Sequence, residues 1–322
     1  MFKVELRSES GFDKVVLKDT DTNSFAEIIP SCGAILHAFG IEHNGSLINV
    51  IENYNDNTDF KMNVAGKGFK SCKLSPFACR IKDAVYNFSD KKYTIEKFLL
   101  GKHALHGLIY DASFEIISTE ANDQHVLVSM QYKYNATDPG YPFEYTCIVT
   151  YTLKKNNALT ILTEVSNDSK SPMPIQDGWH PYFTFGKKID DLQLEFQSKE
   201  RMIFNDMIPT GEKVHYEEFG SLKKIEQITF DDCFTMNFAE CQPLCVLRDP
   251  ERKLQIEIFP AKSYPYLQLY TPDHRQSIAI ENLSAPPDTF NNGIDLKILS
   301  PNEKANFTTI YKITSLPLQG KK

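Results

Sequence analysis

The feature that most constrains this chain is a long succession of short strand-like runs, each separated from the next by a hairpin turn signal. Apolar alternation or β-branched residues mark these runs, which predicts strands. Clear runs cover residues 34–41, 125–134, 145–153 and 158–165. Turn signals include Ala121-Asn122-Asp123, Lys155-Asn156-Asn157 and Asp249-Pro250-Glu251. Because turns this short connect antiparallel strands, we expect neighbouring strands to pair in that way.

Helical patterns are almost missing from the sequence. No long segment shows apolar residues at helical spacing, and residues 215–225 are at best one short helix. The strands outnumber those of an ordinary open sheet, so we expect two or more packed sheets. The sequence therefore predicts an all-β fold, a large antiparallel β-sandwich.

A single domain spanning residues 1–322 is expected, because no repeat, linker or composition shift divides the chain. A chain of this length can bury roughly three quarters of its unfolded surface, so its stability requires neither a metal nor disulfides. The last five residues carry no strand pattern and suggest a loose tail.

Charge and composition narrow the range of partners and compartments. The net charge is −7 and the basic residues form no stripe, which argues against a nucleic-acid partner. The first residues lack a signal-peptide pattern, and no apolar run reaches about eighteen residues, so we expect a cytoplasmic protein without a membrane contact. The seven cysteines form no CxxC pair and read as reduced residues. Cys241 and Cys245 lack the further ligands of a metal site, and none is expected.

The segment from Asp177 to Phe185 combines a glycine, an imidazole and several aromatic rings. Pro181 favours an extended backbone at His180 and cannot donate to a strand ladder, which places His180 at a strand end. The pleat would turn His180, Tyr182 and Thr184 to one face, and Trp179, Pro181, Phe183 and Phe185 to the other. On the residue alone, a histidine with satisfied hydrogen bonds at an aromatic edge is the alternative to a functional one.

A second candidate is Glu281, at the end of the strand-like run 277–281. Alternation places it on one face with Ser277 and Ala279, whose small side chains leave space beside the carboxylate. The loop 286–288 just downstream could form a wall of that space. A solvated glutamate at a strand end is the alternative interpretation.

Three further residues are weaker candidates when each is taken alone. Arg80 carries a planar fork of donors suited to neighbouring hydroxyls, and His106 stands before a glycine that would allow a ligand close to the backbone. Asp231 is followed by Asp232, and an extended backbone would turn the two carboxylates to opposite faces. A surface salt bridge, a turn histidine and a solvated acidic turn are the respective alternatives.

Taken together and in order, these segments resemble the galactose mutarotase, or aldose 1-epimerase, family, over nearly the whole chain. The resemblance rests on several short motifs. They are Arg80-Ile81, Leu105-His106-Gly107, Gly140-Tyr141-Pro142, Val165-Ser166-Asn167-Asp168, His180-Pro181-Tyr182-Phe183, Ile208-Pro209-Thr210-Gly211, Asp231 beside Phe230, and Glu281 with the segment 287–291. The chain departs from the pattern at Cys79, which stands where an asparagine commonly precedes the arginine.

The resemblance implies a galactose mutarotase-like supersandwich and a cofactor-free enzyme that interconverts the α and β anomers of a free aldohexose such as glucose or galactose. Glu281 would be the base and His180 the acid, while Arg80, His106 and Asp231 would bind the sugar. A carboxylate near His180 is expected to keep the imidazole protonated. Rings of the central motif, Trp179, Tyr182 and Phe183, are expected to be available to sugar C–H faces.

Two other functions stay open at this point. A hexose-6-phosphate 1-epimerase would need added Arg or Lys beside the sugar, and no such cluster lies near the motifs. A non-catalytic carbohydrate-binding or sugar-sensing protein would keep the pocket without the chemistry. In each case the expected partner is a small-molecule sugar, and the chain would be a monomer or a homodimer.

Overall fold

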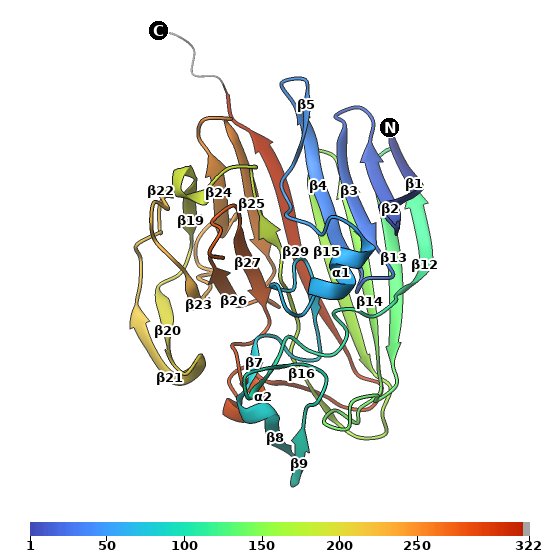
Figure 1. Ribbon diagram of the computed structural model, residues 1–322, viewed down its shortest axis with the longest axis vertical. Helices are drawn as coiled ribbons and strands as arrows, with labels where there is room; N and C mark the ends of the chain where they lie inside the picture. The colour runs from blue at the N-terminus through green and yellow to red at the C-terminus, as the bar shows by residue number, and fades with distance from the viewer. Residues whose placement is uncertain (318–322) are drawn as a thin grey trace.

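The protein is described by a computed structural model that covers residues 1–317, and its all-β architecture confirms the predicted fold class (Figure 1). The tail expected at the C-terminus lies outside the described residues. Three large sheets make up most of the fold. The strand pairs in them are antiparallel, and about half of these pairs join strands that follow one another in the chain. The sandwich is built by setting two of these sheets against the third.

The nine-stranded sheet is the continuous layer of the sandwich. In spatial order its strands are β12 (Glu115–Ala121), β13 (His125–Tyr134), β14 (Tyr145–Lys154), β15 (Ala158–Asn167), β29 (Lys304–Ser315), β25 (Leu254–Pro260), β24 (Cys245–Asp249), β19 (Gln193–Phe196) and β22 (Lys223–Lys224). Strands β13, β14 and β15 coincide with predicted runs, and the predicted turns at Asn122, Asn156 and Pro250 connect antiparallel pairs.

The second layer consists of two sheets. The five-stranded sheet contains β1 (Phe2–Glu9), β2 (Phe12–Asp19), β3 (Ser24–Ile29), β4 (Ile35–His43) and β5 (Ser46–Asn49). The eight-stranded sheet contains, in order, β21 (Ile208–His215), β20 (Glu200–Asn205), β23 (Asp231–Thr235), β26 (Tyr266–Tyr270), β27 (Ile278–Leu283), β17 (Gly178–Trp179) and β6 (Lys73–Leu74), with β18 (Tyr182–Phe183) also paired to β27. A bridge between Ile51 and Phe183 links the two sheets.

The remaining elements are short. The short strands are β7 (Arg80–Ile81), β8 (Val85–Phe88), β9 (Lys91–Thr94), β10 (Leu99–Leu100), β11 (His103–Leu105), β16 (Met173–Ile175) and β28 (Lys297–Leu299). The helices are α1 (Asn57–Asn63), α2 (Thr289–Asn292) and two 3₁₀ turns, Lys82–Ala84 and Ile189–Asp191. Several of these elements (β7, β8, β9, β16 and α2) lie in the lower part of the molecule in Figure 1. Among the described residues, no helix has the length and apolar character needed to cross a membrane.

The core lies between the layers and is formed by alternate residues of the facing strands. Strand β2 contacts β13 and β14 on one side of the molecule, where the blue strands overlie the green ones in Figure 1. On the other side Phe183 packs edge-on against Tyr311, with ring centroids 5.3 Å apart. One continuous apolar cluster includes residues of all three large sheets. A continuous core is what one domain would have, and the assignment of residues 1–322 to a single domain stays a prediction.

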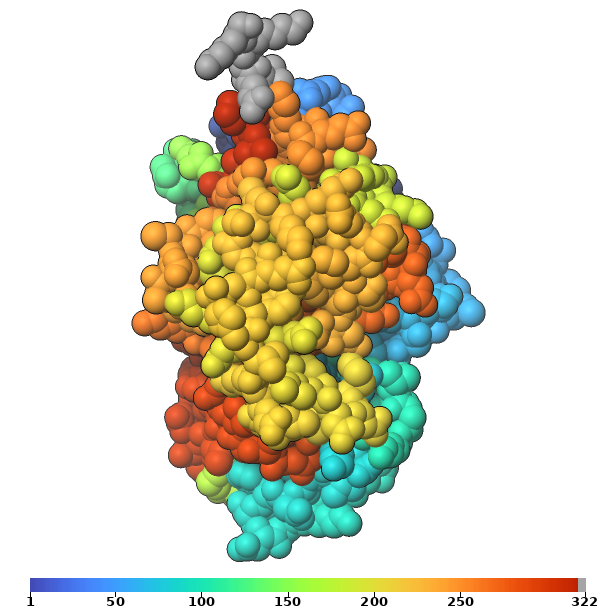
Figure 2. All heavy atoms as spheres, turned by 90° about the vertical axis from the view of Figure 1, so that its left-hand side faces the viewer, coloured from blue at the N-terminus to red at the C-terminus, as the bar shows by residue number. Residues whose placement is uncertain are grey.

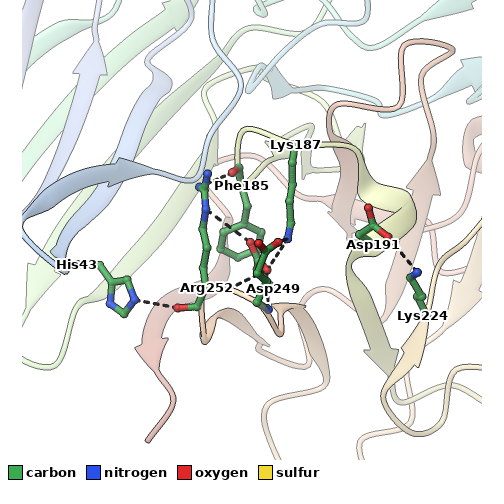
Figure 3. Close-up of polar contacts among 8 residues, drawn as sticks. His43, Phe185, Lys187, Asp191, Lys224, Asp249 and Arg252 are labelled. Atoms are coloured by element: carbon green, nitrogen blue, oxygen red, sulfur yellow. Dashed lines mark hydrogen bonds and ion pairs between the residues drawn. The ribbon is translucent and has the colours of Figure 1, made fainter. Parts of the chain in front are cut away.

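Polar contacts also tie the five-stranded sheet to the turn between β24 and β25 of the nine-stranded sheet (Figure 3). His43, at the end of β4, is hydrogen-bonded through Nε2 to the backbone oxygen of Arg252 at 2.9 Å. Arg252 in turn donates to the backbone oxygen of Phe185, and Lys187 lies 2.7 Å from the buried carboxylate of Asp249. These contacts hold the chain that leaves β18, the strand directly after His180.

Residues 215–225, whose pattern allowed at best one short helix, form no helix. Tyr216 and Phe219 both turn onto the aromatic rings of the sheet, and Phe219 stacks on Phe196 with centroids 5.8 Å apart. The backbone oxygen of Phe219 accepts from the N–H of Phe196 at 2.9 Å, so the segment satisfies its backbone hydrogen bonds against a strand and not within a helix.

Helix α1 was not predicted from the sequence. Its signal is the N-cap Asp56, whose side chain accepts from the N–H of Asp59 at 2.8 Å.

Candidate active site

The five residues proposed from the sequence line one cleft of about 320 Å³, although they are spread over some 200 positions of the chain. The cleft opens between the eight-stranded sheet and the segment that carries α1, β7 and β11. Its lining comprises Ala65, Gly66, Gly68, Phe69, Cys79, Arg80, Leu100, Leu105, His106, His180, Tyr182, Asp231, Gln268, Tyr270 and Glu281. A cleft of this volume is in the range of small-molecule sites.

Two hairpins meet beside this cleft. On the face shown in Figure 2, the yellow hairpin of β20 and β21 lies against the cyan segment that contains β10 and β11. At the tips of these hairpins Lys102 Nζ lies 3.4 Å from Asp206 Oδ2. The contact bridges two parts of the chain that are distant in sequence.

His180 and Glu281 are in direct contact at the floor of the cleft. The imidazole Nε2 lies 3.3 Å from Glu281 Oε1, and both side chains are buried. His180 sits in the break between β17 and β18, as expected from Pro181, and both of these strands pair with β27, which carries Glu281. Backbone bonds fix the break, since the N–H of His180 donates to the oxygen of Cys72 at 3.1 Å.

Burial dominates the protonation of this pair. It raises the pKa of Glu281 well above the usual value of a glutamate, and the charge of Asp231 acts in the same direction. Burial also lowers the pKa of His180 to about 3. The expectation that the carboxylate keeps His180 protonated is therefore wrong in this structure, because loss of hydration outweighs the attraction. Burial therefore favours the uncharged form of each partner, a neutral imidazole beside a protonated carboxyl group.

His106 is held by Cys79 in a reciprocal pair of backbone contacts. The N–H of Cys79 donates to His106 Nδ1 at 3.3 Å, and the N–H of His106 donates to the oxygen of Cys79 at 2.9 Å. Both residues have positive φ, 54° for Cys79 and 59° for His106, a conformation that non-glycine residues adopt mainly where the surroundings enforce it. Because Nδ1 accepts and burial keeps the pKa of His106 well below its usual value, the ring is neutral with its proton on Nε2.

The rings around the cleft stack on these two histidines. His106 and His180 meet edge to face, with centroids 5.0 Å apart. Phe69 packs against His106 with centroids 4.7 Å apart, and Tyr182 stacks on His180 at 4.9 Å with an interplanar angle of 11°. Each imidazole is thereby fixed in orientation by an aromatic neighbour.

Arg80 and Asp231 both line the cleft, Arg80 from β7 and Asp231 from β23. Arg80 lies in β7, where its backbone oxygen accepts from the N–H of Asp288 at 2.8 Å, and its guanidinium has no hydrogen-bond or ion-pair partner within residues 1–317. Asp231 is exposed and its Oδ1 accepts from the amide of Gln268 at 3.2 Å. The neighbouring Asp232 turns away from the cleft and faces Arg201 at 3.6 Å. The structure thus places Asp231, and not Asp232, in the cleft.

Gln268 is a cleft residue that the sequence reasoning missed. It lies on β26 directly opposite Glu281 in the register, and its Oε1 is buried without a hydrogen-bond partner in the described part of the chain. Its signal was alternation, because Tyr266, Gln268 and Tyr270 share one face of an otherwise apolar strand. An unpaired buried amide oxygen is well placed to accept a hydrogen bond from a ligand.

Two expectations about the walls need correction. Trp179 and Phe183 face the core and not the cleft, so Tyr182 is the ring of this motif that a sugar can reach. Trp179 instead lies over Lys73, whose ammonium is 4.6 Å from the ring centroid and forms a fully buried ion pair with Asp177. The loop 286–288 is also not part of the cleft lining. Its role is to hold β7 through the backbone of residue 288.

One group of side chains has metal-ligand types. Donor atoms of Cys79, His106 and Glu281 lie within 4.8 Å of one another. The donor chemistry does not suit an ion at rest, because Nδ1 of His106 already accepts a hydrogen bond and Nε2 carries the proton. Burial also raises the pKa of the Cys79 thiol and of the Glu281 carboxyl, so both ligands would first have to lose a proton.

Comparison with known proteins adds to this geometry. The family model described as aldose 1-epimerase matches residues 14–312. The chain belongs to the aldose 1-epimerase family. Aldose 1-epimerase of Streptococcus thermophilus is 26% identical over 311 residues, which cover 85% of this chain and 87% of the relative. An Escherichia coli K12 protein named uncharacterized protein YihR is 24% identical over 247 residues, or 74% of this chain and 77% of that protein.

Solved structures of a galactose mutarotase-like protein and a galactose 1-epimerase share the fold. A galactose mutarotase-like protein from Clostridium acetobutylicum has a TM-score of 0.84 at 17% identity, covering 98% of this chain and 99% of that one. Galactose 1-epimerase from Lactobacillus acidophilus has a TM-score of 0.81 at 17% identity, covering 98% and 100%. These likenesses confirm the galactose mutarotase-like sandwich, and family membership indicates an isomerase of the mutarotase type that acts on a sugar.

Proposed function

We propose that this protein is an aldose 1-epimerase that interconverts the α and β anomers of a free aldohexose such as glucose or galactose. The observation that carries the proposal is the 3.3 Å contact between His180 Nε2 and Glu281 Oε1 at the floor of the cleft. Ring opening needs one group to take the proton of the anomeric hydroxyl and another to give a proton to the ring oxygen. Two adjacent titratable groups that share one proton can meet both needs.

The proposed reaction proceeds by opening, rotation and closure. Glu281 takes the proton from the anomeric oxygen while His180 gives a proton to the ring oxygen, and the bond between C1 and the ring oxygen breaks. The electron pair of the former O–H bond becomes the second bond of the aldehyde carbonyl. Rotation about the C1–C2 bond presents the other face of the aldehyde, and closure returns both protons, so the pair ends as it began.

The pair must hold one proton in total for this reaction. At rest burial places that proton on the carboxyl of Glu281. In the sugar complex the hydroxyl dipoles and the nearby Arg80 guanidinium would stabilise the ionised carboxylate, so that the same proton could stand on His180. Free sugar therefore converts a neutral resting pair into a base and an acid without a change in the number of protons.

Three residues are proposed to orient the sugar. Arg80 has an unpaired guanidinium, Asp231 offers a carboxylate at the rim, and His106 presents its Nε2–H. Donors and acceptors on several sides can fix one ring so that both proton transfers occur at hydrogen-bond distance, and such positioning lowers the barrier. Tyr182 lines the cleft and would supply aromatic contact for the C–H side of the ring.

The charge of the cleft supports a free sugar over a sugar phosphate. Arg80 is the one Lys or Arg side chain in the described lining, while Asp231 and Glu281 are both acids. A phosphate group would lack a second cation and would meet the Asp231 carboxylate. We expect the protein to accelerate mutarotation of glucose or galactose far more than that of glucose 6-phosphate.

The test is a polarimetric time course that starts from a pure anomer, with purified protein at several concentrations. Acceleration in proportion to protein concentration is expected for a free aldohexose, and a matched His180→Asn protein excludes a contaminating epimerase. A protein that binds the sugar in calorimetry but leaves mutarotation at the buffer rate would be a non-catalytic sugar-binding protein, which would end the proposal.

A further inference from the structure

The Cys79 thiol occupies a central place in the cleft that the proposed proton transfers do not use. Its sulfur lies within 4.8 Å of donor atoms of both His106 and Glu281. Cys79 is 6% exposed and belongs to an apolar cluster that contains Phe69 and Leu105, which also line the cleft. Sugar atoms held between His106 and Glu281 would therefore face a sulfur atom.

Apart from His106 and Glu281, which the proposed function already engages with the sugar, the wall around the sulfur offers almost no hydrogen bonding. Burial raises the pKa of the Cys79 thiol well above its ordinary value, so the group is a neutral S–H, a weak donor and a weak acceptor. It makes no side-chain hydrogen bond within residues 1–317. The neighbouring side chains of Phe69 and Leu105 have no polar atoms. In contrast, the other walls present the polar groups of Arg80 and Gln268.

A sugar hydroxyl set against this stretch would lose its bonds to water without a full replacement, and that loss is unfavourable. A hydrogen atom or a methyl group at the same position would lose nothing and would gain apolar contact. We propose that the cleft is built for a deoxy sugar, an aldose that lacks a hydroxyl at the position facing Cys79. This inference rests on the proposed mutarotase function and names its substrate class.

The first experiment compares kcat/KM for mutarotation between a parent sugar and its 2-, 3-, 4- and 6-deoxy analogues, which all keep the anomeric hydroxyl and the ring oxygen. Rates are measured by NMR exchange and corrected for the uncatalysed rate. The parent is whichever of D-glucose and D-galactose turns over faster. One analogue is expected to match or exceed the parent. The others should fall by roughly 10- to 100-fold, because each would leave a buried or charged group of the cleft, such as Arg80 or Asp231, without its partner.

The second experiment changes the wall itself. Cys79→Asn introduces an amide that can pair with a hydroxyl, and asparagine tolerates the positive φ of this position. The measure is kcat/KM for the parent sugar divided by kcat/KM for the spared analogue, the one that matches or exceeds the parent with the wild-type protein. The variant should raise this ratio by roughly tenfold or more. Cys79→Ser is a smaller polar change that should shift the ratio in the same direction, and it serves if the asparagine variant does not fold. Cys79→Ala keeps an apolar wall and should leave the ratio near that of the wild type.

The outcomes separate this inference from the proposed function. If every deoxy analogue is at least tenfold slower than the parent, or if well-folded Asn and Ser variants leave the ratio unmoved, the substrate class is wrong while the mutarotase function stands. If the wild-type protein accelerates the mutarotation of no sugar in the panel, the function fails and this inference fails with it. A spared analogue whose advantage disappears in Cys79→Asn supports the proposal.

Discussion

His180 and Glu281 approach one another from paired strands, and their side chains meet at 3.3 Å in a place where neither charge is well hydrated. Burial shifts the two pKa values in opposite directions, down for the imidazole and up for the carboxyl. Both shifts disfavour charge, and together they widen the pH range in which the pair carries one proton.

The pH dependence of the reaction follows from this relationship. A second proton enters the pair only as pH falls toward the His180 pKa of about 3, and the shared proton leaves only as pH rises through the raised pKa of Glu281. We expect kcat/KM to be bell-shaped, with an acid limb near pH 3 and an alkaline limb well above the usual glutamate value of about 4.3. A stopped-flow polarimetric profile measures both limbs. An acid limb near the ordinary glutamate pKa would mean that burial does not govern the pair.

The two histidines should differ in their effect on that profile. His106→Asn removes a donor to the sugar but leaves the proton-sharing pair intact, so turnover should fall while both limbs stay in place. His180→Asn removes one member of the pair and should both lower turnover and abolish the two-limbed form. Profiles of the two variants recorded side by side make the comparison. If His106→Asn loses a limb and His180→Asn keeps both, the roles assigned to the two residues are exchanged.

Asp231 and Asp232 form a matched pair for testing sugar binding, because they are adjacent and turn in opposite directions. Asp231→Asn removes a charged acceptor from the cleft and should lower kcat/KM by roughly 10- to 100-fold. Asp232→Asn breaks only the partly exposed contact with Arg201 and should stay within about twofold of wild type. The measurement is kcat/KM of both variants from steady-state kinetics. Equal losses of kcat/KM would show that Asp231 makes no specific contact with the sugar.

The buried ion pair behind His180 yields a prediction about stability. Lys73 and Asp177 are both fully buried, and Tyr264 also donates to the Asp177 carboxylate, at 2.6 Å. Lys73→Met should reduce the free energy of unfolding by about 3–5 kcal/mol, because it leaves an uncompensated buried carboxylate. The double variant Lys73→Met/Asp177→Asn should lose less than the two single variants together. Urea unfolding of the four proteins gives the coupling, and strict additivity would show that the two charges act independently.

Much of the fold could be predicted because strand alternation and turn chemistry are local properties. The runs at 125–134 and 158–165 became strands β13 and β15, since every second residue of each meets the core. The interpretation of residues 215–225 failed because its aromatic residues pack on a sheet whose position the local pattern does not encode. Propensity alone could not show that Phe219 would bond to a strand edge.

The site residues that stand in short sequence motifs could be predicted. Those features of the site that depend on how strands pair, or on how deeply a side chain is buried, could not. Arg80 and His180 stand in short recognisable motifs, and the structure brings both to the cleft. Gln268 was missed because its place opposite Glu281 depends on the pairing of β26 with β27. The direction of the His180 pKa shift was wrong because the sequence shows a nearby carboxylate but not the loss of water around it.

Replacement of Glu281 by glutamine is the most direct test of the central claim, that the His180–Glu281 pair moves the protons. The amide keeps the shape of the side chain and its hydrogen bonding but cannot take the anomeric proton. The measurement is the polarimetric kcat/KM of Glu281→Gln, with sugar affinity from calorimetry and fold from thermal unfolding. We expect a loss of about 10²- to 10⁴-fold in kcat with only a small change in affinity. A well-folded Glu281→Gln protein that retains most of its turnover would contradict the assignment.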